Sequence, residues 1–147
     1  MQGIPLLHDM KRAITLLLLF CPLLSVAEDD FLHTMVQGKY LLVGKAVDST
    51  NTYHGKVEIK DVNGSLVVAR EIAGKNTEGS AAIEAALKGE AKVLRIRFTE
   101  NKVAYEQTCM VASDLDNYAR ISCYLYKPNV KTMQPGLEVF FNDYTAK

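Results

Sequence analysis

The sequence predicts one small all-β domain, with about eight antiparallel strands in an up-and-down β-barrel or a sandwich. From Lys39 onward, short runs rich in Val, Ile, Leu and aromatic residues alternate with turn signals. Several runs carry apolar residues at every second position, which is the period of a strand with one buried face. Two cysteines also fall opposite each other on neighbouring runs. We choose the barrel, because closure removes the exposed strand edges of an open sheet.

The segment 1–27 has the pattern of a cleaved signal peptide. Lys11 and Arg12 precede the apolar run 13–24, and Ser25-Val26-Ala27 supplies small residues at a cleavage site. The apolar run is shorter than the roughly 20 residues that a membrane span requires. We therefore expect an exported protein, periplasmic or secreted, whose mature form starts at Glu28 and has no membrane span.

The expected mature chain has 120 residues (147 minus 27), which suffices for one domain with a hydrophobic core. It divides into a lead-in segment, 28–38, and a β-barrel domain, 39–147. The lead-in is either extended or a short helix capped by Asp29 or Asp30. The 17 basic and 17 acidic residues of the whole chain become 15 and 16 after cleavage. This balance, without a basic stripe, predicts no nucleic-acid partner.

The first strands are expected at Tyr40–Asp48 and Tyr53–Asp61, and the second shows clear alternation. Asn63-Gly64 then supplies a strong signal for a two-residue hairpin turn. That turn pairs Ile59 with Val68, Val57 with Arg70, Gly55 with Ile72, and Lys56 with Glu71. Apolar residues then meet on one face and opposite charges on the other, which supports this register.

Arg70 shares the apolar face with Leu66, Val68 and Ile72. A charge on a core face is costly unless it is paired. Two readings remain open: a rim arginine whose stem reaches out to water, and an anion-binding group inside a cavity.

The segment 78–87 is ambiguous, because its alanines favour a helix and its alternation of small and apolar residues favours a strand. We choose a strand, since small residues suit a tightly curved sheet. Another strand is expected at Ala91–Thr99. A turn at Glu100-Asn101 would pair Phe98 with Val103, Ile96 with Tyr105, Leu94 with Gln107, and Arg95 with Glu106. A last strand is expected at Leu137–Phe141.

The segment 102–127 reads as two strands joined by a polar turn centred on Asp116. Cys109 then lies opposite Cys123, Val111 opposite Ile121, and Gln107 opposite Leu125. Opposed strand residues have β-carbons about 4.5–5.5 Å apart, close to the roughly 3.5–4.5 Å of a disulfide. We expect a Cys109–Cys123 bridge, which suits an exported protein; two buried free thiols are the alternative.

The signal sequence, the eight short strands and the segment Tyr53-His54-Gly55-Lys56-Val57 together resemble avidin- or lipocalin-type barrels in architecture. The resemblance covers most of the mature chain and implies a fold that holds one small ligand. It rests on no family motif, so it transfers no site residues.

No zinc spacing, phosphate loop, nucleotide fingerprint or nucleophile elbow occurs in the sequence. His33 and His54 are expected in solvent, and Asp114–Asn117 lacks the spacing of a calcium loop. We therefore expect a non-enzymatic protein with no cofactor and no metal. An enzyme remains the third class, behind two binding functions.

The first binding function is a small ligand held in the barrel mouth, oriented by Tyr105, Gln107 and Arg70. The alternative is a protein-binding module, such as a periplasmic inhibitor or immunity-type protein, which would use loops near Asp114–Asn117 or the outer ladder of the barrel. That ladder contains Glu106, Thr108, Arg120, Ser122, Tyr124 and Tyr126. Tyr and Arg are enriched at binding hot spots, although ordinary cross-strand pairing also explains such a ladder.

Overall fold

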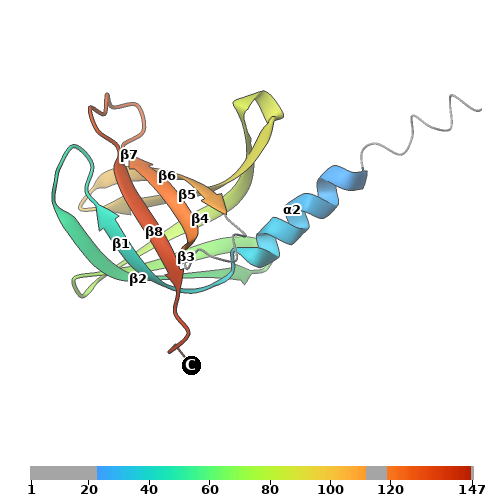
Figure 1. Ribbon diagram of the computed structural model, residues 1–147, viewed down its shortest axis with the longest axis horizontal. Coiled ribbons are helices and arrows are strands. Elements are labelled where there is room, and N and C mark those ends of the chain that lie inside the picture. Colours follow the sequence, from blue (N-terminus) through green and yellow to red (C-terminus); the bar gives the residue numbers. More distant parts are fainter. Residues whose placement is uncertain (1–22, 112–118, 147) are drawn as a thin grey trace, which may run out of the picture. The chain divides into compact units, whose positions relative to one another are not determined.

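The computed structural model describes residues 23–111 and 119–146, and it confirms the predicted eight-stranded antiparallel barrel (Figure 1). Each strand pairs with the next in sequence, and β8 closes the barrel against β1. The strands are β1 (Gly38–Lys45), β2 (Thr52–Val62), β3 (Ser65–Ile72), β4 (Lys75–Ala86), β5 (Ala91–Glu100), β6 (Val103–Val111), β7 (Ala119–Tyr126) and β8 (Gly136–Asn142). This is the up-and-down order expected from short connections between alternating strands.

Residues 28–35 of the predicted lead-in belong to a helix, α2 (Leu23–Met35), which starts before the lead-in. Asp29 and Asp30 lie inside the helix, so the prediction that either caps its N-terminus is wrong. The predicted cleavage site after Ala27 falls within α2, and residues 1–22 lie outside the described part of the chain.

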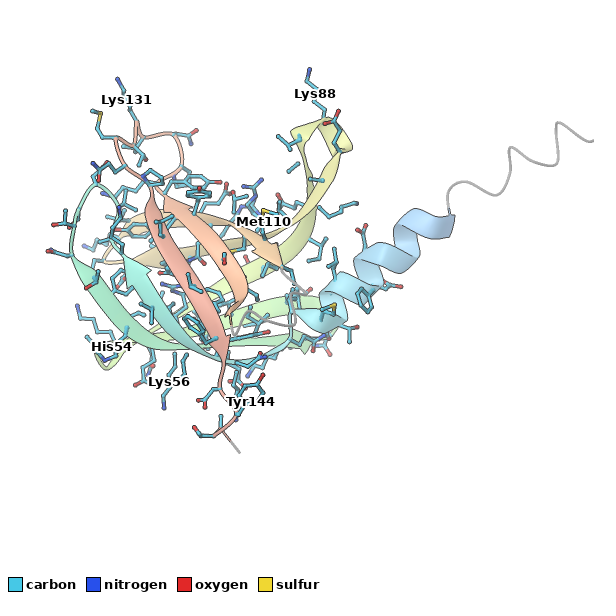
Figure 2. The ribbon with its side chains drawn as sticks, viewed as in Figure 1. His54, Lys56, Lys88, Met110, Lys131 and Tyr144 are labelled. Carbon is cyan, nitrogen blue, oxygen red and sulfur yellow. A yellow bond between two sulfur atoms is a disulfide. The ribbon has the colours of Figure 1, made fainter. Side chains whose placement is uncertain are left out.

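The β2–β3 hairpin has the predicted register. Val57 pairs with Arg70 and Ile59 with Val68, and Lys56 lies opposite Glu71 on the outer face. Asn63 and Gly64 have φ angles of 56° and 82°, which a tight hairpin turn requires at both central positions. His54 and Lys56 are exposed and point away from the barrel (Figure 2).

The ambiguous segment 78–87 forms most of strand β4, as predicted. Its small residues permit close approach between strands: a Cβ at Gly79 would lie 2.5 Å from the backbone oxygen of Arg97. The chain then turns through a short 3₁₀ helix, η1 (Leu87–Gly89), into β5.

The predicted turn between β5 and β6 lies one residue too early in the sequence, so the predicted register of these two strands is wrong. The turn residues are Asn101 and Lys102, with φ angles of 51° and 67°, rather than Glu100-Asn101. The observed pairs are Phe98 with Tyr105, Ile96 with Gln107, Leu94 with Cys109, Arg97 with Glu106, and Arg95 with Thr108. Because the shift is two residues along the partner strand, every side chain keeps its predicted face.

The disulfide between Cys109 and Cys123 is present, and both cysteines face the barrel interior. Their pairing, and those of Val111 with Ile121 and Gln107 with Leu125, match the prediction. The predicted turn centre, Asp116, lies outside the described residues.

The two ends of the barrel differ. At the end where β1 begins, fully buried Val36 joins the core, and its carbonyl accepts a 2.8 Å hydrogen bond from the Tyr40 hydroxyl. The opposite end, here called the mouth, is bounded by the connections 46–51, 73–74, 101–102 and 127–135. Asp48, predicted as the last residue of the first strand, belongs to the first of these connections, since β1 ends at Lys45. Its carboxylate accepts 2.8 Å hydrogen bonds from the backbone of Met133 and Gln134, which ties two mouth connections together.

Candidate functional site

A buried ion pair crosses the barrel interior between β3 and β8. Arg70 donates from Nη1 to Oε2 of Glu138 at 2.8 Å and from Nη2 to Oε1 at 2.6 Å. The two residues are only 3% and 1% exposed. This two-point, charge-assisted geometry is the strongest that an arginine and a carboxylate form. The rim-arginine reading is therefore excluded, and the anion that Arg70 binds is the chain's own carboxylate.

Two further side chains donate to the same carboxylate. The Tyr53 hydroxyl lies 2.5 Å from Oε1 of Glu138, and the Gln107 amide nitrogen donates to Oε2. Glu138 thus accepts from three residues on three strands. We call Tyr53, Arg70, Gln107 and Glu138 the interior cluster.

The surroundings shift the pKa values of Tyr53 and Arg70 in the interior cluster. Burial, and then the neighbouring Glu138 charge, raise the pKa of Tyr53 far above its ordinary value of 10.0. Burial alone would lower the pKa of Arg70, but hydrogen bonding to Glu138 and its negative charge raise the Arg70 pKa overall. Tyr53 is therefore a neutral donor and Arg70 a permanent cation at physiological pH.

The fold makes room for the cluster at one narrow place. Gly44 pairs with Tyr53, and a Cβ at Gly44 would lie 2.6 Å from the Tyr53 ring. No larger residue fits there unless the ring moves. Because Gly44 on β1 has no side chain, the Tyr53 ring has room to reach Glu138.

Aromatic rings extend the cluster toward the mouth. The Arg70 guanidinium lies over the Phe98 ring, 4.1 Å from its centroid. Phe98 in turn stacks on Tyr105, with ring centroids 5.4 Å apart and planes inclined by 18°. Both contacts are favourable geometries for a cation and for ring pairs, and they fix the orientation of the Tyr105 ring.

A cavity of about 260 Å³ occupies the mouth above this arrangement. Its wall combines ring and aliphatic side chains with a few polar ones: Ala46, Val47, Tyr53, Arg70, Ile72, Phe98, Glu100, Tyr105, Leu125 and Lys127. Apolar walls with a few fixed polar groups are typical of small-molecule sites.

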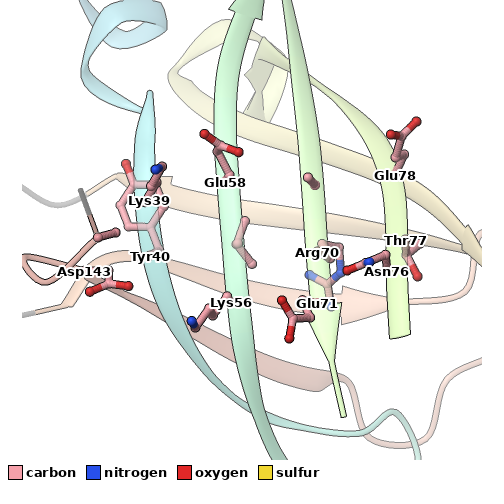
Figure 3. A pocket seen from close by; sticks show the side chains of 13 residues that line it. Lys39, Tyr40, Lys56, Glu58, Arg70, Glu71, Asn76, Thr77, Glu78 and Asp143 are labelled. Carbon is pink, nitrogen blue, oxygen red and sulfur yellow. The ribbon is translucent and has the colours of Figure 1, made fainter. Parts of the chain in front are cut away.

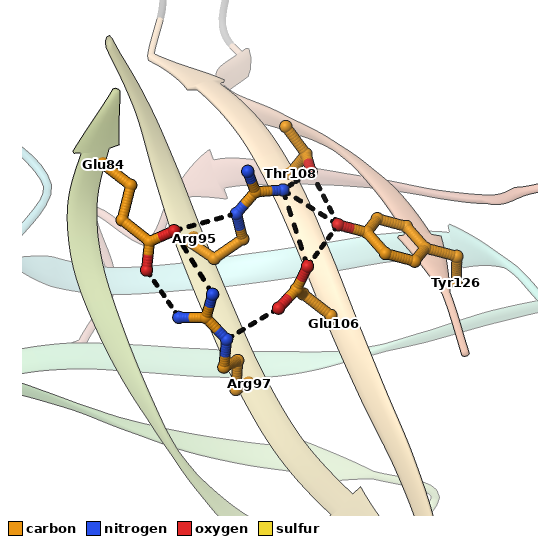
Figure 4. Close-up of polar contacts among 6 residues, drawn as sticks. All are labelled: Glu84, Arg95, Arg97, Glu106, Thr108 and Tyr126. Carbon is orange, nitrogen blue, oxygen red and sulfur yellow. Dashed lines mark hydrogen bonds and ion pairs between the residues drawn. The ribbon is translucent and has the colours of Figure 1, made fainter. Parts of the chain in front are cut away.

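A second polar group of similar composition lies on the outer face of β4 to β7 (Figure 4). We call it the outer network; it consists of Glu84, Arg95, Arg97, Glu106, Thr108 and Tyr126. Arg97 donates to Glu106 at 2.6 Å and to Glu84 at 2.6 Å. The Tyr126 hydroxyl donates to Glu106 at 2.5 Å, and Arg95 bonds Tyr126 at 2.8 Å. These side chains satisfy one another along the barrel wall.

The outer face of β1 to β4 carries a groove of about 440 Å³ (Figure 3). Charged side chains of both signs border it, among them Lys39, Lys56, Glu58, Glu71 and Glu78. The groove is larger than the mouth cavity. Its lining also includes Tyr40, Val57 and Ala69. Its outward side chains are mostly charged, however, and their signs alternate as expected for a solvated strand face.

The most apolar part of the outer surface lies on β8 and its neighbours. Along β8, Gly136, Glu138 and Phe140 are buried, whereas Leu137, Val139 and Phe141 alternate with them and point outward. Strand pairing places three outward apolar side chains opposite them, Leu41 and Val43 on β1 and Tyr124 on β7. Met110 lies one strand further away, on β6, where it pairs with Ser122. Met110 is 71% exposed and Tyr124 58%. We call these seven residues the apolar patch.

The structure distributes the predicted site residues that it describes over four places. Arg70 and Tyr105 line the mouth cavity, and Gln107 lies deeper, in the interior cluster. Glu106 and Tyr126 belong to the outer network, whereas Tyr124 lies in the apolar patch. The Arg120 side chain and the loop 114–117 lie outside what the structure describes.

Sequence reasoning missed Glu138, Tyr53 and Phe98 as site residues. The signal for Glu138 was an inner-face carboxylate two residues from Phe140 in the strand Leu137–Phe141. That signal was masked because the strand's apolar residues mostly point outward. Alternation along their strands predicts that Tyr53 and Phe98 face the core, which does not distinguish them from ordinary core residues.

Within the described ranges, no cluster of three His, Cys, Asp or Glu side chains is placed to hold a metal ion. No helix among these same residues is long and apolar enough to cross a membrane. No protein-family model matches the sequence, and comparison with curated proteins finds no similar chain.

Proposed function

We propose that this protein is an exported, non-enzymatic binding protein that holds a small ligand in the mouth of its β-barrel. The observation that carries the proposal is the cavity of about 260 Å³, whose wall of apolar and polar side chains includes Arg70, bonded to Glu138, and Tyr105, stacked on Phe98. A closed eight-stranded barrel has an interior just wide enough for side chains or one small ligand. Here side chains fill one end, and the cavity lies at the other.

The interior cluster supports the proposal through its energetic cost. A buried ion pair often contributes no more stability than apolar side chains of similar volume would. Packing alone therefore gives little reason for an arginine and a glutamate inside this barrel. A floor of fixed polar groups beneath a binding cavity does give one, because preorganised groups orient a ligand without further ordering cost.

Export is supported by two independent features. The residues 11–27 have the charge, apolar length and small-residue site of a signal peptide. The Cys109–Cys123 bridge suits an oxidising compartment such as the periplasm or the extracellular space.

Native mass spectrometry of the protein purified from the cells that make it tests the ligand directly. The expected spectrum contains a small molecule that is absent from the denatured sample. In a Val47→Trp variant, the indole should fill the mouth cavity and abolish the added mass. Val43→Trp, on the outer face of β1, is the matched control and should retain it. A folded wild-type protein without added mass that also fails to regain any from a cell extract would contradict the proposal.

A second candidate, the protein-binding module of inhibitor or immunity type, is favoured by the apolar patch. The outward side chains of a barrel strand are ordinarily polar, and contiguous exposed apolar surface marks interaction sites. The predicted Arg/Tyr ladder supports it less, because Glu106 and Tyr126 are already bonded within the outer network. Under this alternative, a partner chain would copurify with wild-type and Val47→Trp protein but not with a Met110→Ser, Tyr124→Ser variant.

A further inference from the structure

Three of the ten residues that line the mouth cavity carry aromatic rings. Tyr53, Phe98 and Tyr105 line it together with the aliphatic side chains of Val47, Ile72 and Leu125. The Tyr105 ring is held by stacking on Phe98, and the Tyr53 ring by packing on Gly44 and bonding Glu138. Fixed ring faces select planar partners, because stacked and edge-to-face contacts need defined orientations.

The charged groups around the cavity sum to zero, and the two buried ones are paired with each other. Both terminal nitrogens of Arg70 donate hydrogen bonds to Glu138, at 2.8 and 2.6 Å, and the plane of its guanidinium lies over the Phe98 ring. The remaining charged wall residues are one acid and one base, Glu100 and Lys127. An anion entering the cavity would approach Glu138, and a cation would approach Arg70. Neither would find a buried counter-charge that is free, and a charge buried without a partner is costly.

The volume limits the size of the ligand. Pockets for drug-sized molecules measure about 300–1,000 Å³, and the mouth cavity of about 260 Å³ lies just below that range. A molecule of one or two fused rings with a short substituent fills such a space.

From the aromatic rings in the wall of the mouth cavity, the zero sum of its charges and its volume, we infer that the cavity binds a small, planar aromatic molecule that carries no net charge. The inference rests on the proposed function, because it specifies the ligand of the same cavity. Arg70 and Glu138 act in it as a neutral polar floor, and Tyr105 as the ring on which the ligand stacks.

Four probes of similar size test it at neutral pH by isothermal titration calorimetry. Indole-3-acetamide is neutral and planar, indole-3-acetate is its anionic counterpart, tryptamine is cationic, and cyclohexylacetamide is neutral but not aromatic. Indole-3-acetamide should bind at least roughly tenfold more tightly than each of the other three, which corresponds to about 1.4 kcal/mol. Equal or tighter binding of the acetate, tryptamine or the saturated amide would overturn the inference, as would the absence of binding by indole-3-acetamide.

Matched variants distinguish failure of the inference from failure of the proposed function. Tyr105→Leu, in the mouth, should weaken indole-3-acetamide roughly tenfold. Tyr124→Leu makes the same change on the outer face of β7 and should leave the affinity unchanged. A charged probe that binds best and responds to Tyr105→Leu would remove the inference but leave the mouth as the binding site. Binding that is unchanged by both Tyr105→Leu and the cavity-filling Val47→Trp would show that the ligand does not bind in the mouth, and it would contradict the proposed function. Unchanged amide spectra of each variant verify that it is folded.

Discussion

The interior cluster and the outer network use the same chemistry in opposite surroundings. Each joins arginine to glutamate and adds a tyrosine hydroxyl as a donor to the carboxylate. Arg70 is 3% exposed inside the barrel, whereas the Arg97 side chain is 48% exposed on the outside. The contacts are similarly short, so the two groups differ mainly in their access to water.

This difference in hydration predicts different dependence on each partner. Inside, removing one partner leaves the other charge buried, which costs about 3–5 kcal/mol. Outside, water replaces a lost partner, and exposed pairs contribute about 0–1 kcal/mol. The interior cluster is thus vulnerable to single changes although the pair as a whole adds little net stability.

The largest expected effect is that of Glu138→Gln. This change leaves Arg70 charged and buried without a counter-charge, and it should lower the free energy of unfolding by about 3–5 kcal/mol. Glu106→Gln is the matched change in the outer network and should cost about 0–1 kcal/mol. Urea denaturation of both variants measures the difference. Equal costs would mean that water reaches the interior pair.

The double variant Arg70→Met, Glu138→Leu sharpens the same comparison. Apolar residues of similar volume remove both charges together, so the double variant should be more stable than Glu138→Gln. It should nevertheless lose the small ligand, because the polar floor of the cavity is gone. Denaturation and native mass spectrometry of one preparation give both readouts.

Removal of the disulfide should have the next largest effect. The bridge connects β6 and β7, which carry members of both polar groups. The two cysteines are 14 positions apart. For a loop of about 15 residues, the chain-entropy model gives a stabilisation of about 3 kcal/mol. Because the hairpin already holds the strands together, we expect Cys109→Ala with Cys123→Ala to lower the melting temperature by roughly 5–15 °C with the fold intact. Two free thiols in freshly purified protein would contradict the bridge.

Tyr53→Phe should cost about 2 kcal/mol, the value of a hydrogen bond to a charged group. Burial and Glu138 raise the Tyr53 pKa in the folded protein. Above the ordinary pKa of 10.0, the unfolded chain therefore releases a proton that the folded chain keeps. Wild-type stability should be complete below pH 10.0 and fall above it, and the variant should lack this part of the fall. Denaturation on both sides of that pH tests the sign; parallel curves would disprove it.

The smallest expected effect is that of Arg97→Gln in the outer network. Its partners Glu84 and Glu106 are partly exposed and keep hydrogen bonds from Arg95 and Tyr126, so the cost should be about 0–1 kcal/mol and should shrink further in 1 M salt. The cost of Glu138→Gln should change little with salt, because buried pairs are poorly screened. A loss for Arg97→Gln that is large and independent of salt would make the outer network a structural equivalent of the interior cluster.

Local patterns predicted most of the barrel. Alternation assigned Val57 and Ile59 to the inner face, and Asn63-Gly64 fixed the β2–β3 register. The β5–β6 register failed because two adjacent turn positions were both plausible, and only the observed one puts Asn101 and Lys102 at positive φ. An error of this kind leaves the faces unchanged, since side chains alternate with a period of two residues.

By itself, the sequence determined the strand order, the inward face of Arg70 and the Cys109–Cys123 bridge, because each depends on alternation and short turns. Tertiary structure alone decided what Arg70 binds. Its partner Glu138 lies 68 positions away, on a strand not adjacent to β3, and the two meet only across the interior of the closed barrel. Strand periodicity does not encode that contact: it assigns faces along each strand, whereas closure determines which inner side chains share the buried space.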